Sequence, residues 1–177
     1  MAKLHYAVHK EKGFFPWLVD FISSAPVLVM IFEADGVIQG VRDALGATFV
    51  QKASPDSLRG KYGIWAGINI AHASDAPETA TDEIKLWTTE GGLKESSDAG
   101  DVAKAYIQKY LTGDADYTMA IRDVVKNAIE NRNISDSVLN SLKTLFAKDA
   151  AGIDKSDTDT LAKVVFDFII EEIEKVE

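Results

Sequence analysis

Residues 67–75 read Gly-Ile-Asn-Ile-Ala-His-Ala-Ser-Asp, an apolar stretch that delivers one imidazole, His72, to a turn just before a predicted helix. A neutral imidazole with a pKa near ~6.5 is available as a nucleophile at neutral pH. A single histidine in such a setting is more often packed in a core than catalytic, so both interpretations stay open until its neighbours are considered. The other histidines, His5 and His9, lie four residues apart beside lysines, which is typical of a solvated helix face.

The composition limits the partners and the chemistry of the chain. Its 177 residues suit one medium-sized domain or a domain with a helical extension, and its formal net charge of -9 argues against nucleic-acid or anionic membrane partners. The absence of cysteine excludes disulfides, thiolate catalysis and sulfur-ligated zinc. No apolar run reaches the ~20 residues of a membrane span, and the first residues lack the apolar core of a signal peptide. We therefore expect a cytoplasmic protein.

The first half of the chain alternates between predicted helices and strands. A continuous apolar run over 27–32 predicts a buried strand, and 64–71 supplies a second strand candidate. The stretch 47–62 has no period and predicts a long loop of the kind that is usually functional or disordered. Helical spacing occurs over 4–10, 14–23, 37–45 and 77–87.

The second half is predicted to be helical throughout. The polar, glycine-bearing stretch 91–100 is typical of a linker. A strand remains an alternative for 166–170, because β-branched residues favour one. We predict a first domain over 1–90, a linker over 91–100 and a helical domain over 101–177. Its helices are expected over 102–111, 115–131, 135–148 and 157–176.

Several blocks around His72 occur in an order and spacing that resemble the nucleoside diphosphate kinase family. The likeness runs from His5-Tyr6 to Leu86-Trp87, about half of the chain, and several ordered blocks are more specific than one short motif. The blocks are Lys12-Gly13-Phe14-Phe15-Pro16, Ser24-Ala25-Pro26-Val27, Gly46-Ala47-Thr48, Ser54-Pro55-Asp56-Ser57-Leu58-Arg59-Gly60 and Asn69 to Asp75, followed by Glu83.

The resemblance implies the fold as well. The family has a four-stranded, ferredoxin-like antiparallel sheet, whose first strand carries a Lys-Pro-Asp motif that does not occur in this sequence. We therefore expect an α+β fold, an incomplete ferredoxin-like antiparallel sheet with helices, followed by an all-α helical region.

The resemblance also implies a site. His72 would be the phosphate-accepting nucleophile, and Glu83 would fix its ring, as a triad carboxylate does. Tyr6 and Ser74 are implied as supporting residues, although a packing role is equally open for both. No metal ligands are predicted. Residues implied to bind nucleotide or phosphate are Phe14, Arg42, Thr48, Arg59 and Asn69.

The implied reaction is a ping-pong exchange between nucleotides. A nucleoside triphosphate would phosphorylate His72, and a nucleoside diphosphate would remove the group, with Mg²⁺ brought in by the nucleotide. The family's habit of forming dimers, tetramers or hexamers favours a homo-oligomer. Because the lysine of the missing motif binds phosphate in the family, the alternative is a truncated, catalytically inactive member that acts as a helical interaction module.

Overall fold

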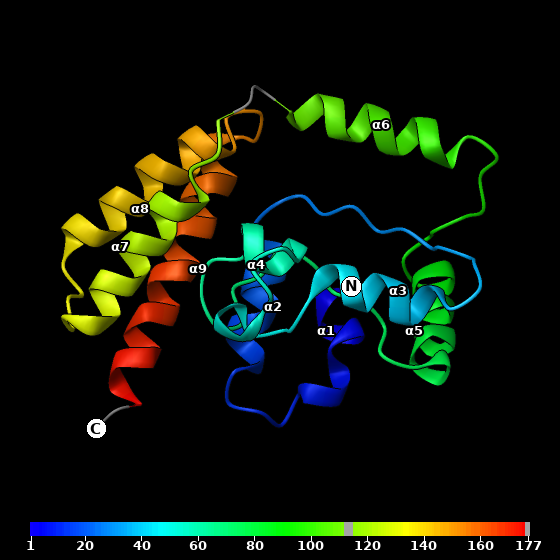
Figure 1. Cartoon of the computed structure of the whole chain (residues 1–177), viewed down its shortest axis with the longest axis horizontal. Helices are drawn as coiled ribbons and strands as arrows, with labels where there is room; N and C mark the ends of the chain where they lie inside the picture. The colour runs from blue at the N-terminus through cyan, green and yellow to red at the C-terminus, as the bar shows by residue number, and fades with distance from the viewer. Residues whose placement is uncertain (112–114, 176–177) are drawn as a thin grey trace. The chain divides into compact units, whose positions relative to one another are not determined.

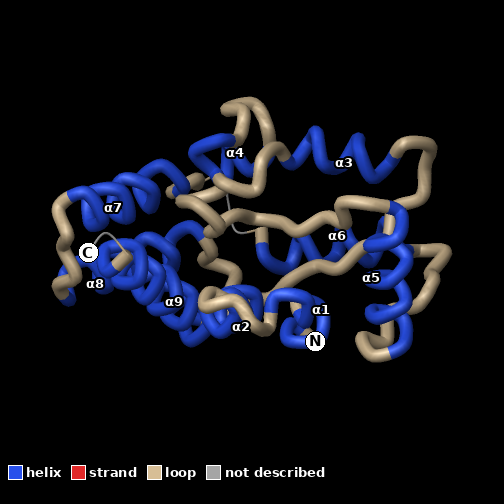
Figure 2. The backbone as a smooth tube through the Cα atoms, turned by 90° about the horizontal axis from the view of Figure 1, so that it is seen from below, coloured by secondary structure: helices blue, strands red, loops and turns tan. Residues whose placement is uncertain are grey.

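Every regular element that the structure describes is a helix. The structure is a computed structural model that describes residues 1–111 and 115–175, and Figures 1 and 2 show only helices and loops over these ranges. The chain divides into two compact units. Unit 1 comprises Met1–Lys12 and Leu28–Gly100, and unit 2 comprises Gly13–Val27 and Asp101–Glu177. The chain therefore enters unit 2 near its beginning and returns to it after residue 100.

Unit 1 is built from short helices whose ends follow local sequence rules. Gly36 and Gly46 bound α3 with φ angles of 64° and 78°, in the left-handed range that glycine adopts without strain. Ser57 caps α4 by accepting a hydrogen bond from the Gly60 amide at 3.1 Å. The elements are α1 (Ala2–His5), η1 (Ala7–His9), α3 (Val37–Leu45), η2 (Val50–Lys52), α4 (Leu58–Tyr62) and α5 (Pro77–Thr89).

Unit 2 holds most of the buried apolar side chains. Its elements are α2 (Phe15–Ser23), α6 (Ala99–Tyr110), α7 (Thr118–Glu130), α8 (Asp136–Asp149) and α9 (Lys155–Glu174). Helices α7, α8 and α9 pack together and α2 packs on α9. Each fully buried Ile, Leu or Val side chain contributes about 1.5–3 kcal/mol relative to an exposed one. The fully buried ones are Ile121, Val125, Leu142, Val165 and Ile169.

Trp17 joins the beginning of the chain to its last helix. Its indole Nε1 donates a hydrogen bond to the carbonyl of Val164 at 2.9 Å. Its ring also lies 5.1 Å from the rings of Phe21 and Phe168. The segment that carries α2 is thus part of the helical core of unit 2.

The expected α+β fold is wrong for the described residues, which contain no strand. The run 27–32 forms no regular element, and Val27, Met30, Ile31 and Phe32 are 48–59% exposed. The run 64–71 makes a tight turn, with only an isolated bridge between Trp65 and Ile68. A β-branched run becomes a strand only where a second backbone satisfies its amides and carbonyls. No such partner lies beside either run within 1–111 and 115–175, so the incomplete ferredoxin-like sheet is not formed.

Most of the predicted helices are present among the described residues, whereas the predicted strands are not. Helices α6 to α9 occupy the four predicted stretches, and 166–170 lies inside α9 rather than in a strand. The end of the last predicted helix, at Val176, falls outside the described residues. The predicted loop 47–62 contains two short helices, η2 and α4, which were too short to produce a period. Across the described residues, no helix combines the length and the apolar character that a membrane span needs.

Candidate active site around His72

His72 is held by a carboxylate that is itself fixed by a third residue. Nε2 of His72 lies 2.8 Å from Oε1 of Glu83, which is on α5, and Ser74 donates its hydroxyl to Oε2 of the same carboxylate at 2.5 Å. An ionised carboxylate only accepts hydrogen bonds, so Nε2 of His72 carries the hydrogen. The lone pair of a neutral ring then lies on Nδ1. The His72 side chain is 38% exposed and that of Glu83 18% exposed, which leaves the imidazole accessible.

His5 belongs to this cluster, and its predicted place on a solvated face is wrong. Its side chain is 8% exposed, and its ring meets the His72 ring edge-on with centroids 4.6 Å apart. The indole of Trp87 donates to Nδ1 of His5 at 3.2 Å, while Nε2 of His5 lies 3.8 Å from Glu83 Oε1. Burial lowers the pKa of His5, His72 lowers it further, and the charge of Glu83 opposes both. His5 is therefore held neutral, with its hydrogen on Nε2.

Tyr6 stands beside the two histidines as a protonated phenol. Its ring lies edge-on to His72 with centroids 5.7 Å apart. Burial raises its pKa to about 12, with the charge of Glu83 adding to the rise and that of Arg59 opposing it. At neutral pH its hydroxyl is thus a neutral donor.

Two guanidinium groups contact the backbone on either side of His72. Arg59 is buried, and its two terminal nitrogens donate to the carbonyls of Gly46 at 2.9 Å and Ala71 at 2.7 Å. Arg42 makes a longer contact of 3.5 Å with the carbonyl of Ala73. Burial lowers the pKa of Arg59, and the charge of Arg42 adds to this. The pair places positive charge at the turn that carries the imidazole.

Asn69 links the remaining predicted residues of unit 1. Its amide nitrogen donates to the carbonyl of Thr48 at 3.0 Å, and its amide oxygen accepts from the Ala71 backbone at 3.2 Å. Thr48 thus enters the cluster through its backbone. Unit 1 therefore connects every predicted site residue except Phe14, which belongs to unit 2 and is 44% exposed.

The sequence reasoning missed two members of the cluster, His5 and Trp87. No local sequence signal pairs them, because they lie 82 positions apart. Both lie within unit 1, where they contact each other directly.

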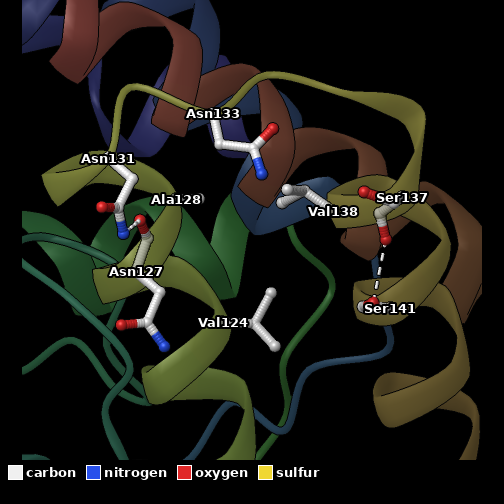
Figure 3. Close-up of a pocket in the computed structure, with 8 residues that line it drawn as sticks. All are labelled: Val124, Asn127, Ala128, Asn131, Asn133, Ser137, Val138 and Ser141. Carbon is white, nitrogen blue, oxygen red and sulfur yellow. Dashed lines mark hydrogen bonds between the residues drawn. The ribbon is translucent and has the colours of Figure 1, made fainter.

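A separate concavity lies between α7 and α8 in unit 2 (Figure 3). It has a volume of ≈ 360 Å³ and is lined by amides, hydroxyls and small apolar side chains, without any titratable group. Its polar groups serve the helices themselves, since Asn131 donates to the Asn127 carbonyl and Ser141 to the Ser137 carbonyl. This concavity therefore offers no acid, base or imidazole of the kind found around His72.

Comparison with known proteins identifies the family of the chain. Residues 1–92 match the family model described as nucleoside diphosphate kinase. The nucleoside diphosphate kinase of Trichormus variabilis is 50% identical over 93 residues, which are 52% of this chain and 62% of that protein. That of Synechococcus sp. (strain WH7803) is 53% identical over 87 residues, 49% of this chain and 57% of that protein.

A third relative extends the match somewhat further. The nucleoside diphosphate kinase of Crocosphaera subtropica is 46% identical over 107 residues, 60% of this chain and 70% of that protein. The chain spans about three fifths of the length of the first of these relatives. Because the family model covers residues 1–92 of 177, the chain belongs to the nucleoside diphosphate kinase family.

Proposed function

We propose that this chain transfers a phosphoryl group from a nucleoside triphosphate to a nucleoside diphosphate through a phosphohistidine on His72. The observation that carries the proposal is the 2.8 Å contact between His72 Nε2 and Glu83. With the ring hydrogen committed to Glu83, the Nδ1 lone pair is the nucleophile. The fixed ring needs no rotation before it attacks, which is the advantage of preorganisation.

The reaction has two balanced halves. In the first, the Nδ1 lone pair forms a bond to the γ-phosphorus of the triphosphate, and the bond from that phosphorus to the bridging oxygen breaks. The diphosphate leaves with the electron pair. The phosphorylated ring is cationic while Nε2 keeps its hydrogen, and the Glu83 carboxylate stabilises that charge. In the second half, a terminal phosphate oxygen of another nucleoside diphosphate attacks the same phosphorus, the N–P bond breaks, and neutral His72 is restored.

The charges around His72 suit an anionic substrate. Arg42 and Arg59 supply positive charge at the turn, and we assign the Arg42 guanidinium to phosphate oxygens, because its contact with Ala73 is long at 3.5 Å. The nucleotide is taken as its magnesium complex, with Mg²⁺ bound mainly by phosphate oxygens. The Glu83 carboxylate is engaged with His72 and Ser74, so it is not assigned to the metal of the nucleotide complex. The stacking role of Phe14 and the assembly into an oligomer in the cytoplasm stay predictions.

The test is chemical labelling of the chain. We expect γ-labelled ATP to transfer its label to the protein in an acid-labile, base-stable form, and a chase with unlabelled GDP to release labelled GTP. His72→Ala is expected to abolish labelling, while His9→Gln, a histidine change that leaves His5, His72 and Glu83 in place, keeps it. An unlabelled but folded wild-type chain would instead favour the alternative, an inactive family member that acts as a helical interaction module.

A further inference from the structure

Three side chains of unit 1 bring together ligand atoms suited to a transition metal. One ring nitrogen each of His5 and His72 and one carboxylate oxygen of Glu83 all lie within 4.8 Å of one another. Glu83 Oε1 lies 2.8 Å from His72 Nε2 and 3.8 Å from His5 Nε2, so modest side-chain shifts suffice to surround one ion. Among the described residues, this is the only such group of histidine and acidic side chains.

The types of donor atom indicate which metal ion the site would prefer. Two imidazole nitrogens and one carboxylate oxygen, with a fourth position left for water, form a ligand set that zinc accepts in tetrahedral geometry. Magnesium prefers six oxygen ligands and retains its water, so it is a poor match for two nitrogens. The half-exposed His72 gives an ion in solution a route to the site.

We propose that His5, His72 and Glu83 bind a divalent transition-metal ion, best matched by zinc, and that the bound ion switches phosphotransfer off. The first part of this proposal, that the three residues bind the ion (the binding half), stands on the geometry alone. The second part, that the ion stops phosphotransfer (the switching half), rests on the proposed function. A metal on Nε2 of His72 displaces the hydrogen from that nitrogen, and the neutral ring then carries its hydrogen on Nδ1. The lone pair that would attack phosphorus is thereby occupied. The ion also takes the Glu83 oxygen that holds the ring.

The hydrogen bond from Trp87 to His5 lowers the affinity of the site for a metal ion. A metal on Nε2 of His5 requires a hydrogen on Nδ1, where the Trp87 indole now donates at 3.2 Å. Two donors cannot share that contact, so this hydrogen bond breaks when the ion binds. Trp87→Phe removes the competing donor and is expected to bind zinc about two- to tenfold more tightly than the wild type, the worth of one neutral hydrogen bond. A merely adventitious surface site would not respond to a change at Trp87.

Binding is measured on the chelator-treated full chain by calorimetric titration with zinc chloride. We expect one ion per chain, at least tenfold weaker binding in His5→Gln, and unchanged binding in His9→Gln, the matched control. Millimolar Mg²⁺ should not displace the zinc. Circular dichroism confirms that each variant is folded, and Glu83→Gln serves as a second ligand variant should His5→Gln unfold. The site is refuted if zinc does not bind, or if His5→Gln and Trp87→Phe bind it as the wild type does.

The switching half is tested by labelling with γ-labelled ATP at buffered concentrations of free zinc. We expect zinc to suppress labelling of the wild type at the concentration that fills the site, and His5→Gln to need at least tenfold more zinc. Zinc bound through the three residues with labelling unaffected would overturn the switch. A chain that binds zinc yet is never labelled, even without the metal, would refute the proposed function and leave the metal site standing.

Discussion

Replacing Glu83 by glutamine separates the charge of this side chain from its hydrogen bonds. In the native site, one carboxylate oxygen lies 2.8 Å from His72 Nε2 and the other accepts from Ser74 at 2.5 Å. A glutamine oxygen still accepts from His72, and its amide group donates to the Ser74 hydroxyl, which also accepts. Glu83→Gln therefore keeps the ring orientation and removes the negative charge. Glu83→Ala removes both.

The size of the effect follows from the kind of hydrogen bond that is lost. A hydrogen bond to a charged group contributes about 1.5–3 kcal/mol and a neutral one about 0.5–1.5 kcal/mol. The difference of about 1–1.5 kcal/mol corresponds to a rate roughly 5–13-fold lower in Glu83→Gln. In Glu83→Ala, His72 and Ser74 both lose their acceptor, and we expect a further reduction of about tenfold or more.

The assay is single-turnover labelling of the chain by γ-labelled ATP in a rapid-mixing instrument. It measures the first chemical step without product release. Glu78→Gln is the matched control, because Glu78 lies exposed in the first turn of the same helix and loses the same charge. The reasoning fails if Glu83→Gln is labelled as fast as the wild type, or if Glu83→Ala is labelled as fast as Glu83→Gln.

Three further predictions concern stability. Arg59→Lys is expected to destabilise the fold by about 2–3 kcal/mol, since an ammonium cannot span the carbonyls of Gly46 and Ala71; an unchanged melting temperature would contradict this. Leu142→Ala, at a fully buried position, should cost about 2–5 kcal/mol in urea unfolding. The control Ile134→Ala, at a 53% exposed position, should cost less than about 0.5 kcal/mol, and equal losses would refute the assigned core. The hydrogen bonds from Thr118 lower the pKa of Asp116. Ionised Asp116 therefore stabilises the fold above the ordinary carboxyl pKa of 3.8, and this contribution is lost as the pH falls through the lower pKa of the folded state. Asp116→Asn should therefore flatten the acid side of the stability curve, and an unaltered slope would contradict the assignment.

The helices were predictable from the sequence because their signals are local. Glycines at 36 and 46 bound α3, and apolar stripes mark α7 to α9. Strands depend on a partner elsewhere in the chain, and the exposed run 27–32 shows that β-branched composition does not supply one. The packing of Trp17 on Val164 spans 147 positions, a separation that no local pattern reports.

The candidate site was also predictable only in part from the sequence. The resemblance pointed to His72 and Glu83, which the structure places in contact, while their catalytic roles stay predictions. His5 was misplaced because the spacing argument assumed one continuous helix through His9. In the structure α1 ends at His5 and a 3₁₀ turn follows, so the regular rotation is broken and His5 faces Trp87 and Glu83.

Helix α2 is synthesised long before α9, the helix on which it packs. The carbonyl and the ring that Trp17 contacts on α9 are synthesised 147 or more positions after Trp17 itself. At roughly 5–20 residues per second, that delay lasts about 7–30 s. Until then, the Trp17 ring lacks the partners on α9 that it contacts in the folded chain.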